Sequence, residues 1–172
     1  LFVGRFVEIK GIRYLLEAME KIDAKLVIVG KGPLENEIQS EAEKLEDKVI
    51  LMGPQDHEKL PVIYASSDVF VIPSITINEN VTEGAPTVIT EALASGLPVI
   101  GTNTGGIPEM IENNKNGFVI PEKDANAIAD KVNYLLSDAM IYQNFSRQAR
   151  MAGEKKSYKN TARAFDELLK KI

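Results

Sequence analysis

The sequence predicts an α/β domain with a doubly wound parallel sheet of about six strands. Short, continuously apolar runs alternate with amphipathic stretches, which is typical of a parallel sheet covered by helices on both faces. After Pro121 the pattern is purely helical. The longest loop, 73–86, follows a predicted strand. We therefore expect it at the carboxyl edge of the sheet, where folds of this class bind ligands.

Each predicted strand is a short apolar run, and the six runs cover residues 1–6, 25–30, 48–53, 68–73, 98–102 and 117–120. Such runs fit strands that are buried on both faces. Amphipathic stretches between them predict helices near 11–21, 34–45, 57–66, 86–95 and 106–112. Pro86 and Pro108 support two of these starts, because proline favours the first turn of a helix. Three more helices are expected at 124–137, 139–152 and 158–171.

The composition is that of one soluble globular domain: 172 residues, 44% of them hydrophobic and 26% charged. A net charge of −5 argues against general nucleic-acid binding. The lack of cysteine excludes disulfides and thiolate metal sites and suits a reducing, cytoplasmic compartment. A single histidine, His57, cannot build a histidine-rich metal site. No apolar run approaches the ~20 residues that span a bilayer, and no signal peptide is visible.

The chain opens LFVGRF, without a methionine and already inside a predicted strand. A natural amino terminus rarely begins in this way. We therefore expect residues 1–172 to be a single domain excised from a longer chain, whose N-terminal half is missing.

The segment VGRFVEIKG places Arg5 and Lys10 in the loop after the first strand, between Gly4 and Gly11. Two cations at the carboxyl edge of a parallel sheet suit a diphosphate, because arginine can donate two parallel hydrogen bonds to phosphate and lysine supplies a compact positive charge. Taken alone, the segment fits a solvated loop with ordinary surface charges at least as well.

Two glycine-containing turns follow other strands. VGKGP is an incomplete dinucleotide fingerprint, because Gly30 and Gly32 are followed by Glu35 at the third glycine position. A structural turn is the better interpretation of this segment. GTNTGGIPE offers Gly105 and Gly106 as a backbone nest for an anion, and it fits a structural turn equally well.

The stretch EGAPTVITE carries Glu83 and Glu91 eight residues apart. Because Pro86 favours a helix start between them, we expect Glu83 in a loop and Glu91 on a polar edge of the helix. The first helix amides, of Thr87 and Val88, then favour an anion. One carboxylate can accept hydrogen bonds from a ribose while the other holds a sugar hydroxyl. Two solvated glutamates are the alternative interpretation.

Together these segments resemble the C-terminal, donor-binding domain of retaining GT-B glycosyltransferases of group 1, family 4. The likeness covers, in order, VGRFVEIKG, VIVGKGP, VILMGPQDHEKLPVIYASSDVFVIPS, EGAPTVITEALASGLPVIGTNTGGIPEMI and NGFVIPEKDANAIADKV. The block over 83–118 is the most specific, since Glu83 and Glu91 match the family's paired glutamates. The implied fold is the Rossmann-like half of a GT-B enzyme, followed by C-terminal helices.

The resemblance also implies roles for matching positions. Arg5 and Lys10 fall where the family grips the donor diphosphate. Glu91 falls where the ribose hydroxyls are held, and Glu83 where the transferred sugar is gripped. The stretch 53–55 falls at the base, and amides near 85, 87 and 88 fall at the sugar and phosphate. The substrate-binding positions expected beside Glu91 are therefore Gly4, Gly53, Pro54, Gln55, Gly84, Ala85, Thr87 and Val88.

One departure from the family pattern concerns the sugar. The commoner pattern is Glu-Gly-Phe-Gly, whereas this chain has Glu83-Gly84-Ala85-Pro86. Pro86 removes an amide donor and Ala85 removes a bulky wall. We therefore expect the contacts to the sugar, rather than those to the nucleotide, to differ from the family pattern.

The implied reaction is retaining transfer of a hexose from a nucleoside-diphosphate sugar to a glycan or lipid-linked acceptor. Catalysis would be mainly electrostatic, because Arg5, Lys10 and the helix amides stabilise charge on the leaving diphosphate. No metal or other cofactor is implied. The acceptor site is expected in the missing N-terminal domain, so this fragment alone should catalyse almost nothing. The class implies polysaccharide biosynthesis in the cytoplasm, with room for peripheral membrane association through the missing domain.

Three alternatives stay open at this point. A nucleotide-sugar epimerase shares the GT-B architecture, although the charged set favours a transferase. A noncatalytic nucleotide-binding module remains an alternative, because Pro86 removes an amide donor from the expected sugar site. An NAD-binding Rossmann domain is disfavoured by the broken glycine fingerprint.

Overall fold

The computed structural model describes residues 1–78, 81–156, 160, 162, 166 and 169–170. The strands are β1 (Phe2–Val3), β2 (Leu26–Val29), β3 (Val49–Gly53), β4 (Phe70–Ile72), β5 (Val99–Thr102) and β6 (Gly117–Ile120). The helices are α1 (Ile12–Ala18), α2 (Glu35–Lys44), α3 (Leu60–Ala65), α4 (Thr87–Ala94), α5 (Ile107–Met110), α6 (Ala125–Leu136) and α7 (Ala139–Lys155). Short 3-10 turns cover Glu8–Lys10, Met19–Lys21, Glu46–Lys48 and His57–Lys59.

All strand pairs are parallel, in two three-stranded sheets with the orders β1-β2-β3 and β4-β5-β6. The two sheets adjoin at β1 and β4. The Leu1 nitrogen donates to the Val69 carbonyl oxygen at 2.8 Å, and the Val71 amide donates to the Leu1 carbonyl oxygen at 2.9 Å. The spatial order is therefore β3-β2-β1-β4-β5-β6. The strand order reverses between β1 and β4, so the topological switch point lies there.

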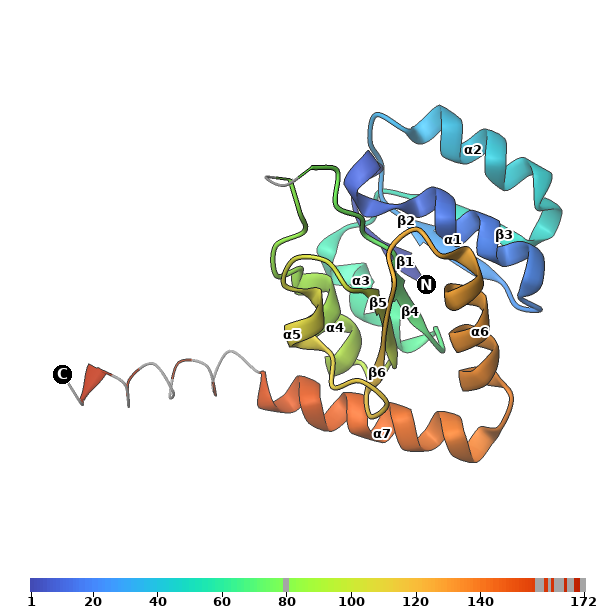
Figure 1. Cartoon of the computed structure of the whole chain (residues 1–172). Helices are drawn as coiled ribbons and strands as arrows, with labels where there is room; N and C mark the ends of the chain where they lie inside the picture. The colour runs from blue at the N-terminus through green and yellow to red at the C-terminus, as the bar shows by residue number, and fades with distance from the viewer. Residues whose placement is uncertain (79–80, 157–159, 161, 163–165, 167–168, 171–172) are drawn as a thin grey trace.

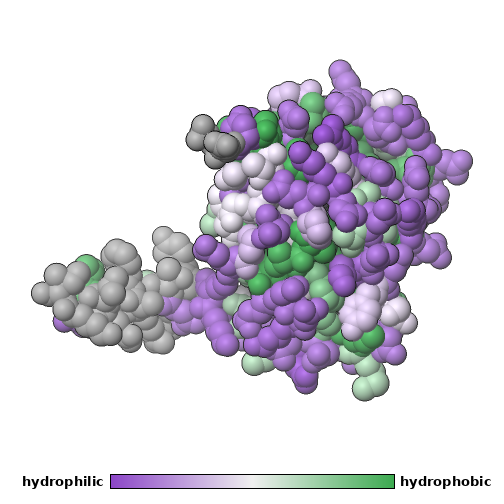
Figure 2. Space-filling view, in the orientation of Figure 1, coloured by the Kyte–Doolittle hydropathy of each residue, from purple (hydrophilic) through white to green (hydrophobic). Residues whose placement is uncertain are grey.

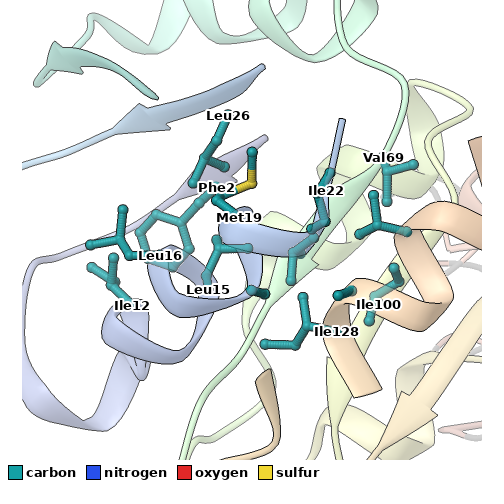
Figure 3. Packing of buried hydrophobic residues seen from close by; sticks show 14 of the residues in the cluster. Phe2, Ile12, Leu15, Leu16, Met19, Ile22, Leu26, Val69, Ile100 and Ile128 are labelled. Atoms are coloured by element: carbon teal, nitrogen blue, oxygen red, sulfur yellow. The ribbon is translucent and has the colours of Figure 1, made fainter. Parts of the chain in front are cut away.

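Helices cover both faces of this sheet, and each face has its own hydrophobic cluster (Figure 1). On one face α1 and α6 pack against the strands around Phe2, Leu15 and Ile100, and Figure 3 shows α1 laying its apolar side chains over them. On the other face Ile89 and Leu93 of α4 are fully buried. The predicted doubly wound α/β fold is confirmed.

The predicted elements differ from the observed ones mainly at their ends. The predicted strand 1–6 is shorter, because after Val3 the chain runs beside the turn that follows β2, where the Phe6 amide donates to the Lys31 carbonyl oxygen. The predicted helix 57–66 begins as a 3-10 turn, and the one predicted at 139–152 runs on to Lys155. The predicted helix 158–171 falls mostly outside the described residues. Within the described part of the chain, no helix is both long and apolar enough to cross a membrane.

Candidate functional site

The loops that follow β1 and β4 pack against each other at the switch point. Gly11 ends the first loop in the left-handed region at φ 61°, and a Cβ at this position would lie 2.0 Å from the Pro73 carbonyl oxygen. The Ile75 amide donates to the Ile9 carbonyl oxygen at 2.8 Å. This close approach requires glycine at position 11. These backbone contacts fix the two loops relative to each other.

An ion pair joins the two loops. The Lys10 Nζ atom lies 2.6 Å from Glu83 Oε2, and the two side chains are only 17% and 13% exposed. The hydroxyl of buried Ser74 donates to the same carboxylate oxygen at 3.0 Å. Because both charges are largely shielded from water, their attraction is stronger than that of a surface pair. The structure thus brings together two of the predicted site residues that lie 73 positions apart.

The backbone at Glu83 is held by the glycine pair after β5. Gly105 has φ +53°, and a Cβ there would lie 1.6 Å from the Glu83 carbonyl oxygen. The Gly106 amide is shared between the carbonyl oxygens of Glu83, at 3.2 Å, and Gly84, at 3.1 Å. Of the two interpretations of GTNTGGIPE, the structure therefore shows the structural turn, which supports the loop that carries Glu83.

Glu91 lies on α4, as predicted, and a buried tyrosine holds it. The Tyr64 hydroxyl donates to Glu91 Oε2 at 2.9 Å, although the tyrosine is only 2% exposed. Burial, and then the neighbouring Glu91 charge, raise the pKa of Tyr64 well above its ordinary value. Tyr64 is therefore a permanent, neutral donor that fixes one oxygen of Glu91.

The amino end of α4 lies between the two glutamates. Pro86 is the N-cap rather than the first helical residue, with φ −71° and ψ 120°. The amides of Thr87 and Val88 precede the first intrahelical donor, so they remain available to a ligand. The face of the molecule shown in Figure 2 is mostly hydrophilic, with a pale area of weakly polar residues on the left of the main body.

The remaining predicted residues lie around this centre. Arg5 is exposed in the loop after β1, and the Gly4 amide donates to the Val29 carbonyl oxygen. Gly53 has φ +64°, and its carbonyl oxygen accepts from the Gly30 amide at 3.0 Å. Pro54 is exposed, and the Gln55 side chain donates to the Met52 carbonyl oxygen at 2.7 Å. These residues share the carboxyl edge of the sheet with Lys10 and Glu83. Gly4 adjoins that pair, since a Cβ at this position would lie 3.9 Å from the Lys10 Cε atom.

The incomplete dinucleotide fingerprint after β2 is a structural turn. A Cβ at Gly30 would lie 1.9 Å from the Gly4 carbonyl oxygen, and one at Gly32 would lie 2.5 Å from that of Phe6. Both glycines are thus required by close packing of the backbone.

A cavity of about 320 Å³ lies away from this site. It is lined mainly by core residues such as Leu15, Met19 and Val132, together with residues 66–68 just before β4. It therefore opens at the amino edge of the sheet. Because doubly wound folds bind ligands at the carboxyl edge, the Lys10–Glu83 region is the candidate site instead. Within the described residues, no group of three or more His, Cys, Asp or Glu side chains gathers as a metal site.

Ser74 and Tyr64 were not predicted as site residues from the sequence, although the glutamates that they contact were. Ser74 directly follows Pro73 at the end of a predicted strand, a position that often carries polar ligand-binding groups in this fold. Tyr64 stood inside an amphipathic helix, where an aromatic residue is ordinarily part of the core. Only the hydrogen bond from its hydroxyl to Glu91 distinguishes Tyr64 from an ordinary core residue.

The chain matches the family described as "Glycosyl transferases group 1" over residues 1–152. It is 36% identical over 137 residues to a putative colanic acid biosynthesis glycosyltransferase, WcaL, from Salmonella typhimurium, covering 76% of this chain and 34% of that relative. The chain spans less than half the length of the curated relatives it matches.

Solved structures agree with this assignment. The C-terminal domain of a glycosyl transferase group 1 family protein (LpcC) from Francisella tularensis superimposes with a TM-score of 0.78 at 25% identity, covering 90% of this chain and 84% of that one. TarM from S. aureus, solved with UDP, superimposes with a TM-score of 0.79 at 27% identity, covering 90% of this chain and 31% of that one. The fold is that of a GT-B C-terminal domain, and the chain belongs to the glycosyl transferases of group 1.

Proposed function

We propose that this chain is the donor-binding domain of a glycosyltransferase that transfers a sugar from a nucleoside-diphosphate sugar with retention of configuration. The observation that carries the proposal is the contact of Lys10, Glu83 and Ser74 at the switch point of the sheet. It puts a cation, an anion and the amino end of α4 at one ligand-binding edge. The relative TarM was solved with UDP, which supports a nucleotide as part of the ligand.

The proposed roles follow the chemistry of each group. Lys10, Arg5 and the amides of Thr87 and Val88 bind the diphosphate, and Glu91 accepts hydrogen bonds from the ribose hydroxyls. Gly4 contributes backbone beside the diphosphate, and residues 53–55 contact the base. Glu83 binds hydroxyls of the transferred sugar, beside the backbone of residues 84–85.

In the reaction, the bond between the sugar C1 and the diphosphate oxygen breaks, and a bond from C1 to the acceptor oxygen forms. The acceptor hydroxyl gives its proton to the leaving diphosphate, on which the negative charge develops. Lys10 and Arg5 stabilise that charge, and Lys10 is already held at the site by its contact with Glu83. Glu83 and Glu91 act as binders in this scheme, and neither acts as a glycosidase acid or base.

The proposal extends to the complete protein. We expect a hexose donor, a glycan or lipid-linked acceptor bound by an N-terminal domain, and a role in polysaccharide biosynthesis. The relative WcaL is described as a biosynthetic glycosyltransferase, which supports this direction. We place the enzyme in the cytoplasm, with peripheral association at the inner face of the membrane when its acceptor is lipid-linked.

A thermal-shift screen of the full-length protein against UDP-, GDP- and ADP-sugars tests the proposal. We expect one nucleotide class to raise the melting temperature, with a smaller shift in Lys10→Ala and Glu91→Ala. If no nucleotide sugar binds, the proposal is wrong. Incubation with the donor alone separates a transferase from an epimerase, because only an epimerase returns an altered donor sugar.

A further inference from the structure

The Glu122 carboxylate, just after β6, takes part in hydrogen bonds with the segments that follow β4 and β5. Glu122 Oε2 accepts from the Thr76 amide at 2.6 Å, and Oε1 accepts from the Thr76 hydroxyl at 2.8 Å. The Thr104 hydroxyl lies 2.8 Å from the Thr76 hydroxyl and also hydrogen-bonds the carboxylate. Thr76 begins the long loop after β4, and Thr104 lies in the turn after β5.

A second set of hydrogen bonds, two residues earlier in the same segment, reaches Glu83. Thr102 donates to the Ser74 carbonyl oxygen at 2.5 Å, and the Ser74 hydroxyl donates to Glu83. Ser74, Thr102 and Thr104 are among the buried polar residues, at 0%, 1% and 4% exposure. Buried polar groups that are fully hydrogen-bonded hold a local structure rigidly. The segment 74–76 is therefore held at both ends: Thr102 contacts the Ser74 carbonyl oxygen, and Glu122 contacts the Thr76 amide.

The loop that carries Glu83 is thus held at two places. Glu122 holds its beginning at Thr76, and the Gly106 amide holds its end at Glu83 and Gly84. Both contacts act on the backbone of the loop that presents Glu83 to Lys10.

Glu122 acts as an anion in this position. Its burial alone would raise its pKa, but the hydrogen bonds from Thr76 and Thr104 outweigh that effect and hold the pKa below the ordinary value. Hydrogen bonds to an ionised acceptor are shorter and stronger than neutral ones. The ionised Glu122 carboxylate therefore holds Thr76, at the beginning of the loop, more strongly than a neutral acceptor would.

We propose that Glu122 is a positioning residue of the donor site: by holding Thr76 it fixes Ser74 and the loop, and so keeps Glu83 in place to bind the transferred sugar. This inference rests on the proposed function. Glu122 touches neither Glu83 nor Lys10, so it acts on the donor only through the loop. Its effect should appear in turnover more than in the affinity for a free nucleoside diphosphate, because that ligand lacks the sugar.

Three variants of the full-length protein test this. Glu122→Ala removes the anchor. Glu122→Gln retains an oxygen for the Thr76 amide and adds a nitrogen that can donate to the Thr76 hydroxyl, so it keeps the geometry without the charge. Glu112→Ala is the control, because Glu112 is an exposed carboxylate that pairs with Lys115. If Glu122→Ala does not fold, Thr76→Val and Thr104→Val remove hydroxyl partners of Glu122 and carry the same prediction at a smaller size.

Hydrogen exchange without added nucleotide is measured first, so this arm does not depend on the donor. Glu122→Ala should increase exchange in the loop 73–86, while Glu122→Gln and Glu112→Ala should behave like the wild type. In steady-state assays with the donor found by thermal shift, kcat of Glu122→Ala should fall ~10-fold or more, since small misplacements can cost up to about 10²-fold. Glu122→Gln should recover most of this loss.

Unchanged exchange in Glu122→Ala would show that Glu122 is no anchor. Increased exchange with unchanged turnover, or a Glu122→Gln variant as slow as Glu122→Ala, would overturn the positioning role. A wild-type protein that binds none of the nucleotide sugars, yet shows the exchange pattern, would instead overturn the donor site and with it the assignment of Glu122 to that site.

Discussion

Glu83 and Glu91 lie eight residues apart in the sequence, yet the structure holds them in opposite ways. Glu83 lies in a loop and pairs with a cation from another loop. Glu91 lies on a helix and accepts from the neutral hydroxyl of a buried tyrosine. An ion pair can be exchanged for a pair with an incoming phosphate, whereas a carboxylate oriented by a buried donor is already in place. In the donor site that we propose, the sugar end at Glu83 would therefore be adaptable and the ribose end at Glu91 preorganised.

The largest expected effect is that of Glu83→Ala on turnover. Removing one positioned hydrogen bond to a reacting group can cost ~10²–10³ in rate, so kcat of the full-length enzyme should fall by that order. Affinity for the free nucleoside diphosphate should not fall, because Glu83 competes with the diphosphate for Lys10. Calorimetry and transfer assays on the same preparation measure both quantities. A collapse of affinity would assign Glu83 to the nucleotide, and no change in either would make it a structural partner of Lys10 alone.

The second effect is that of Lys10→Ala on affinity. A charge-assisted hydrogen bond contributes ~1.5–3 kcal/mol, so binding of UDP or GDP should weaken ~10-fold or more. Arg5→Ala should act in the same direction, and Lys115→Ala is a control, because that lysine belongs to an exposed pair with Glu112. Both Lys10→Ala and Arg5→Ala should keep the fold. Unchanged affinity in both, measured by calorimetry, would contradict the diphosphate assignment.

Much of this arrangement was open to prediction from the sequence, because it depends on local rules. Continuous apolar runs marked the strands, and Pro86 separated the elements that carry Glu83 and Glu91. The extent of the first strand was overestimated, because an apolar run does not reveal that the chain leaves the ladder after Val3.

The partners of the site residues could not be predicted in the same way. Lys10 and Glu83 are 73 residues apart, Tyr64 and Glu91 are 27 apart, and Thr76 and Glu122 are 46 apart. Lys10–Glu83 and Thr76–Glu122 meet because parallel strands bring the loops of one sheet edge together. Tyr64 and Glu91 meet because α3 and α4 pack against each other. A buried tyrosine and a carboxylate after a strand carry no local signal of such a partner.

A third and smaller effect tests the ribose end. Glu91→Ala should bind a nucleoside diphosphate and its 2′,3′-dideoxy form about equally, whereas the wild type should prefer the ribose form. Tyr64→Phe keeps Glu91 but removes the hydroxyl that orients it, a loss of ~0.5–1.5 kcal/mol for one neutral hydrogen bond. It should therefore show a reduced preference for the ribose form. A thermodynamic cycle of protein against ligand isolates this coupling. Zero coupling for Glu91 would make it a solvated glutamate, and full coupling in Tyr64→Phe would make the tyrosine a core residue only.

The smallest effect concerns pH and the anchor of the Glu83 loop. The folded pKa of Glu122 lies below its ordinary value of 4.5, because the hydrogen bonds from Thr76 and Thr104 outweigh its desolvation. For a carboxylate with a lowered folded pKa, the unfolded state binds the proton more readily, so the stabilisation is complete above about pH 4.5 and is lost as the pH falls through the folded pKa. Glu122→Gln cannot titrate, so the difference in melting temperature between it and the wild type should be largest near pH 7 and shrink below pH 4.5.

Glu112→Gln provides a matched comparison, because Lys115 also lowers the pKa of Glu112, but on the exposed surface. Its difference should be the smaller of the two and should diminish with added salt. A difference for Glu122→Gln that stays constant from pH 7 to pH 4 would mean that the carboxylate holds the loop by shape rather than by charge.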